Sequence, residues 1–351
     1  MNREKHSWLY DILFLLVLLM AGYLRLTGVN WGDDGNQHPD ENFLLGVVGS
    51  MQAQKCADVA VPVAACPPEQ KQWISLGDYF DSKTSTLNPY NLGYSFFVYG
   101  NLPMNIVRIT AEATNNLDLK TVGRQASALS DLFTILLLYL IVSRLYGQRT
   151  GLLAALFSSL AVMQIQQSHF FTTDLFVNPF AFLAIYFAVL IFDRKKKEPT
   201  TDVIEPVIEN AEPEELPNKN IQIKEIALRL VRDPLFLLSI GFGFAFGMAL
   251  ASKVNIYPLA ILLPGAFAVR YFIDLKETGH SPKSEYWTLM LVCLVAGGLA
   301  ALISFRIFQP YAFDGLLPSQ QWIANIKEQR LQAKGDADLP WNLQWARRTH
   351  L

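Results

Sequence analysis

The sequence predicts an all-α membrane protein, a polytopic bundle of about seven transmembrane helices with a long loop after the first helix. Apolar residues make up 51% of the 351 residues and charged residues only 17%, a balance too apolar for a soluble domain of this length. A helix needs roughly 20 apolar residues to cross a hydrocarbon core about 30 Å thick. Seven stretches meet this requirement: 8–26, 125–146, 151–167, 171–192, 235–252, 256–273 and 287–308.

The first and third of these stretches need separate treatment. The first follows Arg3 and Lys5, as in a secretory signal peptide, but it is long and no small-x-small cleavage site closes it. We therefore expect an uncleaved anchor. The third is short and ends in a glutamine-rich run, residues 164–167, so we expect its outer end to meet water or protein.

Basic clusters predict the orientation. A cytoplasmic N-terminus places four of them inside: Arg144 with Arg149, Arg194 to Lys197, Arg229 with Arg232, and Arg270 with Lys276. This is the positive-inside pattern, and the opposite orientation would put every cluster outside. We expect an integral protein of the cell (inner) membrane with residues 27–122 outside. The net charge of −2 provides no basic surface for nucleic acid.

Residues 198–220 differ in composition from the rest of the chain. They are rich in Pro and Glu and poor in aromatic residues, which predicts a disordered cytoplasmic linker. Apolar residues between 223 and 231 then recur at helical spacing. This pattern suits either a helix on the inner membrane surface or an extension of the next transmembrane helix.

The long outer loop, residues 27–122, contains a further apolar segment and two cysteines. Counting residues 92–110 as a crossing would reverse all later segments against the charge rule, so we expect a helix in the outer interface, with Tyr90, Tyr94 and Tyr99 as interfacial aromatics. Cys56 and Cys66 would lie in an oxidising compartment, which favours a disulfide over two free thiols.

Ionisable and polar side chains gather at the expected outer ends of five helices. Each alone has an ordinary explanation, such as an arginine reaching the interface. Together they indicate a site, because ionisable groups at a membrane border are costly and usually line one. The set is His38, Asp40, Glu41, Arg124, Asp131, His169, Asp174, Lys253, Arg306 and Gln309.

These residue types suit the transfer of a sugar from a lipid phosphate. A carboxylate can take the proton of the incoming hydroxyl, and cations can stabilise the negative charge that grows on the departing phosphate. A general acid is not needed, because the leaving group is already a stable anion. One base and several cations are therefore enough.

Short motifs in a fixed order carry a resemblance to a known family. They are Asn36–Gln37–His38–Pro39–Asp40–Glu41, the segments 123–131 and 167–174, and Ala251–Ser252–Lys253, supported by segments 79–103 and 306–311. With these motifs the chain resembles the membrane glycosyltransferases of the GT-C superfamily. The likeness is to the bacterial branch related to dolichyl-phosphate-mannose protein mannosyltransferases and to the lipid A aminoarabinose transferase, and it covers nearly all of the chain apart from the linker.

The resemblance implies an inverting glycosyltransferase with a polyprenyl-phosphate sugar donor, a lipid, glycan or protein acceptor, and a site facing the periplasm or exterior. Asp40 would be the catalytic base with Glu41 beside it, and Asp174 a second important carboxylate. The residues expected on the donor phosphate are Arg124, Lys253 and Arg306. The residues expected to line the site elsewhere are His38, Asp131, His169 and Gln309.

Metal dependence differs among the branches of this superfamily. The ligands of a divalent ion would be His38, Asp40, His169 and Asp174. The spacing of the histidines fits no tight ligand motif, so metal-free catalysis is favoured.

Two other functions stay open. Asp131 inside a crossing suits a transporter, although the charges crowd one surface and no internal repeat is present. Members of the superfamily generally continue with further helices, whereas this sequence stops at Leu351. We therefore expect one transmembrane domain over residues 1–351, shortened at its C-terminus and with 309–351 outside. A relative that keeps the fold without the activity is the third possibility.

Overall fold

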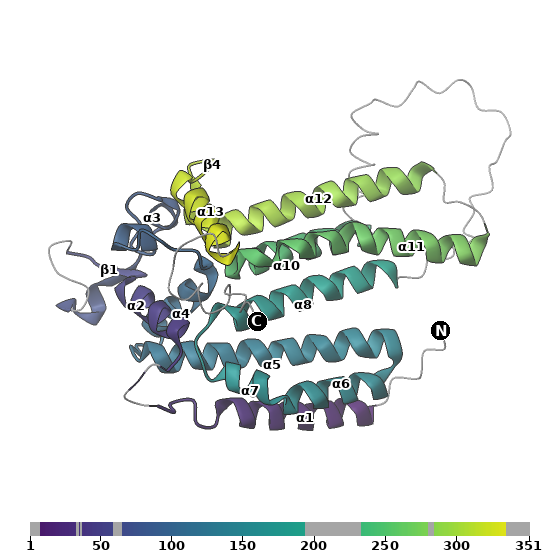
Figure 1. The fold of residues 1–351 in the computed structure, drawn as a ribbon, viewed down its shortest axis with the longest axis horizontal. Coiled ribbons are helices and arrows are strands. Elements are labelled where there is room, and N and C mark those ends of the chain that lie inside the picture. The colour runs from purple at the N-terminus through teal and green to yellow at the C-terminus, as the bar shows by residue number, and fades with distance from the viewer. Residues whose placement is uncertain are drawn as a thin grey trace, which may run out of the picture.

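The computed structural model describes residues 8–32, 35, 37–58, 65–193, 233–279 and 284–334, and they form a bundle of long helices with smaller elements gathered at one end (Figure 1). Six described helices are long and apolar enough to cross a membrane. The predicted helical membrane fold is therefore confirmed. The bundle helices are α1 (Trp8–Leu26), α5 (Leu119–Tyr146), α6 (Gln148–Leu160), α7 (Val162–Ser168), α8 (Thr173–Phe192), α10 (Pro234–Ser252), η4 (Val254–Ile261), α11 (Leu262–Thr278) and α12 (Ser284–Phe308).

The smaller elements lie beyond the ends of α1, α10 and α12 (Figure 1), and we call this part, the described residues of 35–118 and 309–334, the loop end. Its first part contains α2 (Pro39–Ser50), β1 (Gln54–Cys56), η2 (Pro68–Gln70), β2 (Lys71–Trp73), α3 (Leu76–Phe80), η3 (Pro89–Leu92) and α4 (Asn101–Ala113). Its second part contains η5 (Pro310–Ala312), β3 (Phe313–Asp314), β4 (Leu317–Pro318) and α13 (Gln320–Lys334).

The third predicted crossing is broken, unlike the continuous helix expected over 151–167. Helix α6 ends at Leu160, Ala161 is extended, and α7 begins at Val162. Two carbonyls beside the break accept hydrogen bonds from the Arg25 guanidinium, Ser158 O at 3.2 Å and Ser159 O at 3.0 Å. A backbone break at membrane depth requires such a donor, because lipid supplies none.

Arg25 also forms a buried ion pair. Its Nε donates to Asp131 Oδ2 at 2.5 Å, and both side chains are within 1% of complete burial. Burying either charge alone would be costly, so the pair stabilises the contact of α1 with α5. Asp131 thus lies among α1, α5 and α6.

Small residues permit the close contact of α10 with α12. A Cβ atom built on Gly243 would lie 2.0 Å from Gly297 O, and one on Gly247 would lie 2.5 Å from Ala301 O. Only glycine permits this approach, in the manner of small-residue interfaces in membranes. At the loop end, α2 and α4 share an apolar core with α5 and α8 that includes Leu44, Val48, Met104, Val107, Phe171 and Phe176.

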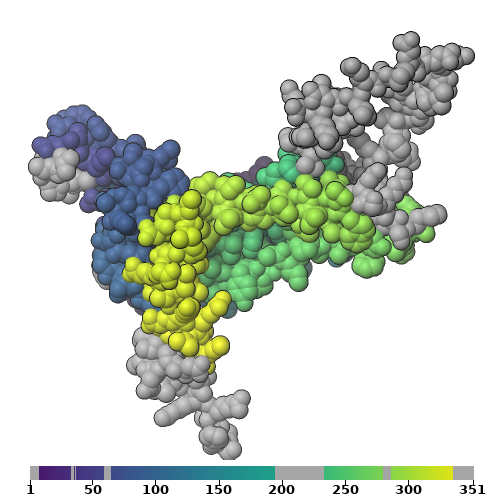
Figure 2. All heavy atoms as spheres, turned by 90° about the horizontal axis from the view of Figure 1, so that it is seen from above, coloured from purple at the N-terminus to yellow at the C-terminus, as the bar shows by residue number. Residues whose placement is uncertain are grey.

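The end of α12 and the segment after it are hydrogen-bonded to the first part of the loop end. Tyr79 Oη donates to Ile307 O at 2.8 Å, the Ser85 and Tyr311 hydroxyls are 2.8 Å apart, and Asn325 Nδ2 donates to Ser95 O at 3.1 Å. In the space-filling view, yellow α13 crosses the boundary between the blue part of the loop end and the green bundle (Figure 2).

The antiparallel pair of β1 and β2 lies at the far side of the loop end, and the structure joins Cys56 to Cys66 by a disulfide. Cys293 is a buried free thiol in α12. The predicted linker 198–220, the helix predicted after it and the last residues of the outer segment, 335–351, lie outside the described residues.

Candidate active site

The acidic motif forms the start of α2. His38 is the N-cap, and its Nδ1 accepts from Asp40 N at 3.2 Å, while Pro39 occupies the first helical position, where its missing N–H is not needed. Asp40 and Glu41 therefore lie in the first turn, where the helix dipole favours negative charge. Glu41 is fully buried and Asp40 is partly exposed, so the neighbouring carboxylates have different surroundings.

Glu41 pairs with Arg124, and neither side chain is exposed. Arg124 Nε and Nη2 donate to the two carboxylate oxygens of Glu41, each at 2.7 Å, and Phe171 N donates to Oε1 at 2.9 Å. Arg124 Nη1 donates to the carbonyls of Val29 and Trp31 at 2.9 Å. This position differs from the predictions of a catalytic Glu41 and a phosphate-binding Arg124, because both charged groups are enclosed and hydrogen-bonded within the protein.

Asp40 meets a tyrosine of the same loop. Tyr99 Oη donates to Asp40 Oδ1 at 3.2 Å, and the Tyr99 ring lies against Phe43, with the ring centroids 5.6 Å apart. Burial, followed by the nearby negative charges of Asp40 and Asp174, raises the pKa of Tyr99 above its usual range. The phenol is consequently a hydrogen-bond donor at neutral pH, with two carboxylates near it.

Asp174 and Lys253 form an ion pair between two helix ends. Asp174 lies in the first turn of α8, Lys253 is the C-cap of α10, and Nζ donates to Oδ1. Both side chains remain accessible, at 53% and 38%. Next to Lys253, Ser252 O accepts from Gly100 N at 3.2 Å, which brings Tyr99 to the same place. We call Asp40, Tyr99, Asp174 and Lys253 the acid–lysine cluster.

Arg306 and Gln309 end α12 near the start of α4. The Arg306 guanidinium lies over the rings of Phe80 and Phe313, at 5.1 and 5.2 Å from their centroids, and is partly exposed. Gln309 is buried, and its Oε1 accepts from Asn101 N, two residues after Tyr99. Gln309 therefore supports the segment that carries Tyr99.

His169 occupies a backbone junction. Its Nδ1 is 2.7 Å from Ile165 O and its Nε2 is 2.9 Å from Thr27 O, so the ring connects α7 to the end of α1. Among the described residues, no three His, Cys, Asp or Glu side chains form a group that could hold a metal ion. The set His38, Asp40, His169 and Asp174 thus does not fit a divalent cation here, and we assign no step to one.

The observation that favoured a transporter has another explanation. Asp131 is neutralised by Arg25 and enclosed by three helices, so it is not presented to a path through the bilayer. The ion pair with Arg25 gives Asp131 a structural role, so its presence inside a helix does not require a transport function.

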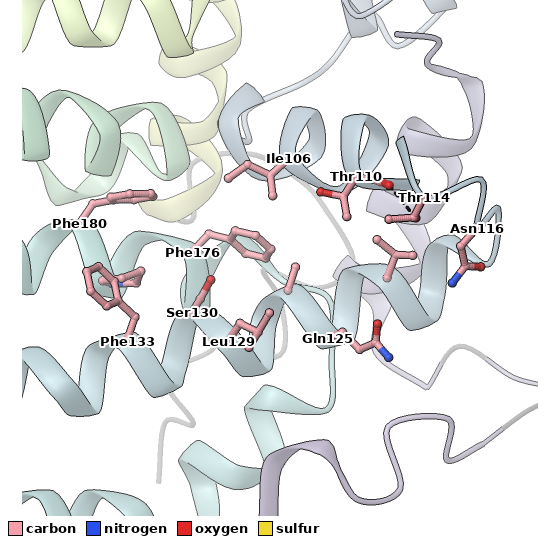
Figure 3. Close-up of a pocket in the computed structure, with 13 residues that line it drawn as sticks. Ile106, Thr110, Thr114, Asn116, Gln125, Leu129, Ser130, Phe133, Phe176 and Phe180 are labelled. Atoms are coloured by element: carbon pink, nitrogen blue, oxygen red, sulfur yellow. Dashed lines mark hydrogen bonds between the residues drawn. The ribbon is translucent and has the colours of Figure 1, made fainter. Parts of the chain in front are cut away.

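A lateral groove of about 620 Å³ lies between α4, α5 and α8. Asn116 and Gln125 are at one end and Phe133 and Phe180 at the other, so the groove changes from polar to apolar along α5 (Figure 3). None of the predicted site residues is among the described residues that line it. The groove and the acid–lysine cluster are therefore separate features.

Sequence reasoning did not include Tyr99 among the site residues and did not identify Arg25 as the partner of Asp131. Tyr99 was expected only as an interfacial aromatic. The signal present in the sequence is the glycine next to Tyr99, Gly100. The structure shows why a glycine is needed there: a Cβ atom on Gly100 would lie 1.9 Å from the carbonyl oxygen of Ala251, the first residue of the Ala251–Ser252–Lys253 motif. That close approach joins the two motifs in space.

Residues 106–199 match the model of the dolichyl-phosphate-mannose-protein mannosyltransferase family. The match covers α5 to α8, and with them Arg124 and Asp174. Over this stretch the chain is similar to that family. The helical membrane fold is confirmed, and the protein is an integral membrane protein.

A solved structure is also similar. It is the Archaeoglobus fulgidus oligosaccharyltransferase, tethered by a disulfide to an acceptor peptide that contains the NVT sequon. The TM-score is 0.44 and the identity 12%, over 93% of this chain and 38% of that one. This chain therefore spans well under half of the length of that transferase. No curated protein sequence matches the chain significantly.

Proposed function

We propose that this protein is a GT-C glycosyltransferase that moves a sugar from a polyprenyl-phosphate donor to a hydroxyl acceptor on a lipid, glycan or protein, with inversion at the sugar carbon. The observation that carries the proposal is the acid–lysine cluster: the partly exposed Asp40 binds Tyr99, and the next residue, Gly100, binds the end of α10 where Lys253 pairs with Asp174. A base and a cation at one accessible place are the two parts that the reaction requires.

The bonds change in one displacement. The acceptor oxygen bonds to the anomeric carbon while the bond from that carbon to the phosphate oxygen breaks, and the electron pair leaves with the polyprenyl phosphate. Asp40 takes the proton of the acceptor hydroxyl. Lys253 stabilises the charge on the departing phosphate, and Arg306, partly exposed in the last turn of α12, is a second cation for it. Asp174 orients the Lys253 ammonium.

We place the loop end on the outer side of the membrane. Arg144, Arg149, Arg270 and Lys276 lie at or near the opposite ends of their helices, so a cytoplasmic position for that end satisfies the positive-inside rule. The disulfide between Cys56 and Cys66 fits an oxidising compartment at the loop end.

Replacement of the base tests the proposal. Asp40→Asn keeps the size of the side chain but removes its basicity, so we expect the transfer rate from a short-chain polyprenyl-phosphate sugar to fall by about 10²- to 10⁴-fold. Glu69→Gln, at an exposed position of η2, is the control and should leave the rate unchanged. An Asp40→Asn protein with the wild-type rate would exclude Asp40 as the base.

A further inference from the structure

Tyr99 contacts the proposed base directly, and the proposed transfer step gives it no role. Its Oη donates to Asp40 Oδ1 at 3.2 Å, and its ring is held between Phe43 and Phe97, at centroid distances of 5.6 and 6.0 Å. The negative charge of Asp174 also acts on the phenol. Tyr99 is thus the described side chain that links the carboxylate of α2 to the ion pair at the ends of α8 and α10.

Hydrogen bonds to the backbone on both sides of Tyr99 hold its segment in place. Gly100 N donates to Ser252 O at 3.2 Å, and the lack of a side chain at Gly100 allows this contact with the end of α10. Asn101 N donates to the Gln309 side chain after α12. Asn325 of α13 donates to the carbonyl of Phe97 at 3.4 Å. Such a fixed segment can hold a hydroxyl in one position, which an exposed loop cannot do.

A base that takes a proton through one oxygen must keep the other oxygen in a fixed direction. The Tyr99 hydroxyl occupies Oδ1 of Asp40 and leaves Oδ2 to accept the proton of the incoming hydroxyl. Because the phenol keeps its proton at neutral pH, it donates to Oδ1 throughout the working range.

We propose that Tyr99 is a positioning residue for the Asp40 base: its hydroxyl binds Asp40 Oδ1 and orients the carboxylate toward the acceptor. This inference rests on the proposed function, since it assumes that Asp40 takes the proton. It adds a residue to the machinery that neither the motifs nor the family match assigns.

Tyr99→Phe tests the role of the hydroxyl while the ring packing is retained. We expect kcat to fall by about 10- to 100-fold, the loss typical of one hydrogen bond to a charged group, while KM for the donor changes less than about twofold. A purely structural role would not confine the loss to kcat.

Tyr94→Phe is the matched control. Tyr94 lies in the same loop and also packs on Phe43, at 5.8 Å, but its hydroxyl contacts Ser50 Oγ rather than a carboxylate. We expect wild-type kcat and KM for this variant. Wild-type kcat in Tyr99→Phe would overturn the proposal.

A double-mutant cycle separates this inference from the proposed function. Thermal unfolding of Tyr99→Phe, Asp40→Ala and the double variant should show that the two effects are not additive, because each single change removes the hydrogen bond that the two side chains share. If the two effects are coupled but the wild-type protein has no transfer activity, the proposed function is refuted and the contact between Tyr99 and Asp40 stands. If the two effects are additive and the wild-type protein is active, only the positioning role of Tyr99 is refuted.

Discussion

At the level of single residues, Glu41 and Arg124 organise the site without being exposed in it. Two hydrogen bonds join the pair, and three groups outside it, the carbonyls of Val29 and Trp31 and the N–H of Phe171, bind the two side chains. Asp40 precedes Glu41 in the same helical turn, so the pair fixes the start of α2 and with it the direction of the base. A buried pair of this kind contributes to position more than to stability.

Breaking this pair should destabilise the protein strongly. In Glu41→Gln the Arg124 guanidinium stays buried without its counter-charge, and we expect a loss of about 3–5 kcal/mol in the free energy of unfolding. Arg124→Lys should also be destabilising, because an ammonium cannot reproduce the two-pronged contact with Glu41. Thermal unfolding in detergent measures both effects.

The control for these variants is an exposed pair at the loop end. Lys55 Nζ donates to Asp78 Oδ2 at 2.9 Å, with about half of the Lys55 side chain exposed. Lys55→Gln should change the melting temperature little, because water screens the interaction. If the Glu41→Gln and Lys55→Gln variants both melted at the wild-type temperature, the proposed structural role of the buried pair would be wrong.

At the level of elements, hydropathy predicted the helices but not the break between α6 and α7. The break depends on Arg25, which lies at the end of the first apolar stretch, where an arginine ordinarily reaches water. The structure instead turns its guanidinium inward to Asp131 and to the carbonyls of Ser158 and Ser159. Hydropathy reports the length of a segment and carries no information about a donor from another helix.

Arg25→Met should therefore destabilise the bundle by about 3–5 kcal/mol, because Asp131 remains as a buried, uncompensated carboxylate. Adding Asp131→Leu should recover part of this loss, since no buried charge is left, but Ser158 O and Ser159 O still lack their donor. Unfolding of the single and double variants measures the recovery. Arg149→Met, at an exposed position in the first turn of α6, is the control. A double variant no more stable than Arg25→Met would contradict the explanation.

At the level of the whole molecule, the sequence predicted which helix ends carry polar groups but not which groups meet. Asp40 meets Tyr99 and Asp174 meets Lys253, and the Gly100–Ser252 contact connects these two pairs, whereas Arg124 and Asp131 lie in buried ion pairs. The difference arises from partners distant in sequence, such as Glu41 at 83 positions from Arg124 and Arg25 at 106 positions from Asp131. A single sequence places residues along a helix, and only packing selects their partners.

The orientation of the molecule decides whether the acid–lysine cluster can meet a donor and acceptor outside the cell, and it can be measured directly. In a Cys56→Ser/Cys66→Ser background, one new cysteine replaces Leu76, which is 79% exposed at the loop end, and in a second protein one replaces Tyr146, which is 72% exposed at the opposite end of α5. Cys293 stays in both because it is buried. We expect a membrane-impermeant maleimide to label position 76 in intact cells and position 146 only after lysis, because the basic helix ends hold that side in the cytoplasm. The reverse pattern would place Asp40 inside the cell and remove the basis for transfer at the outer face.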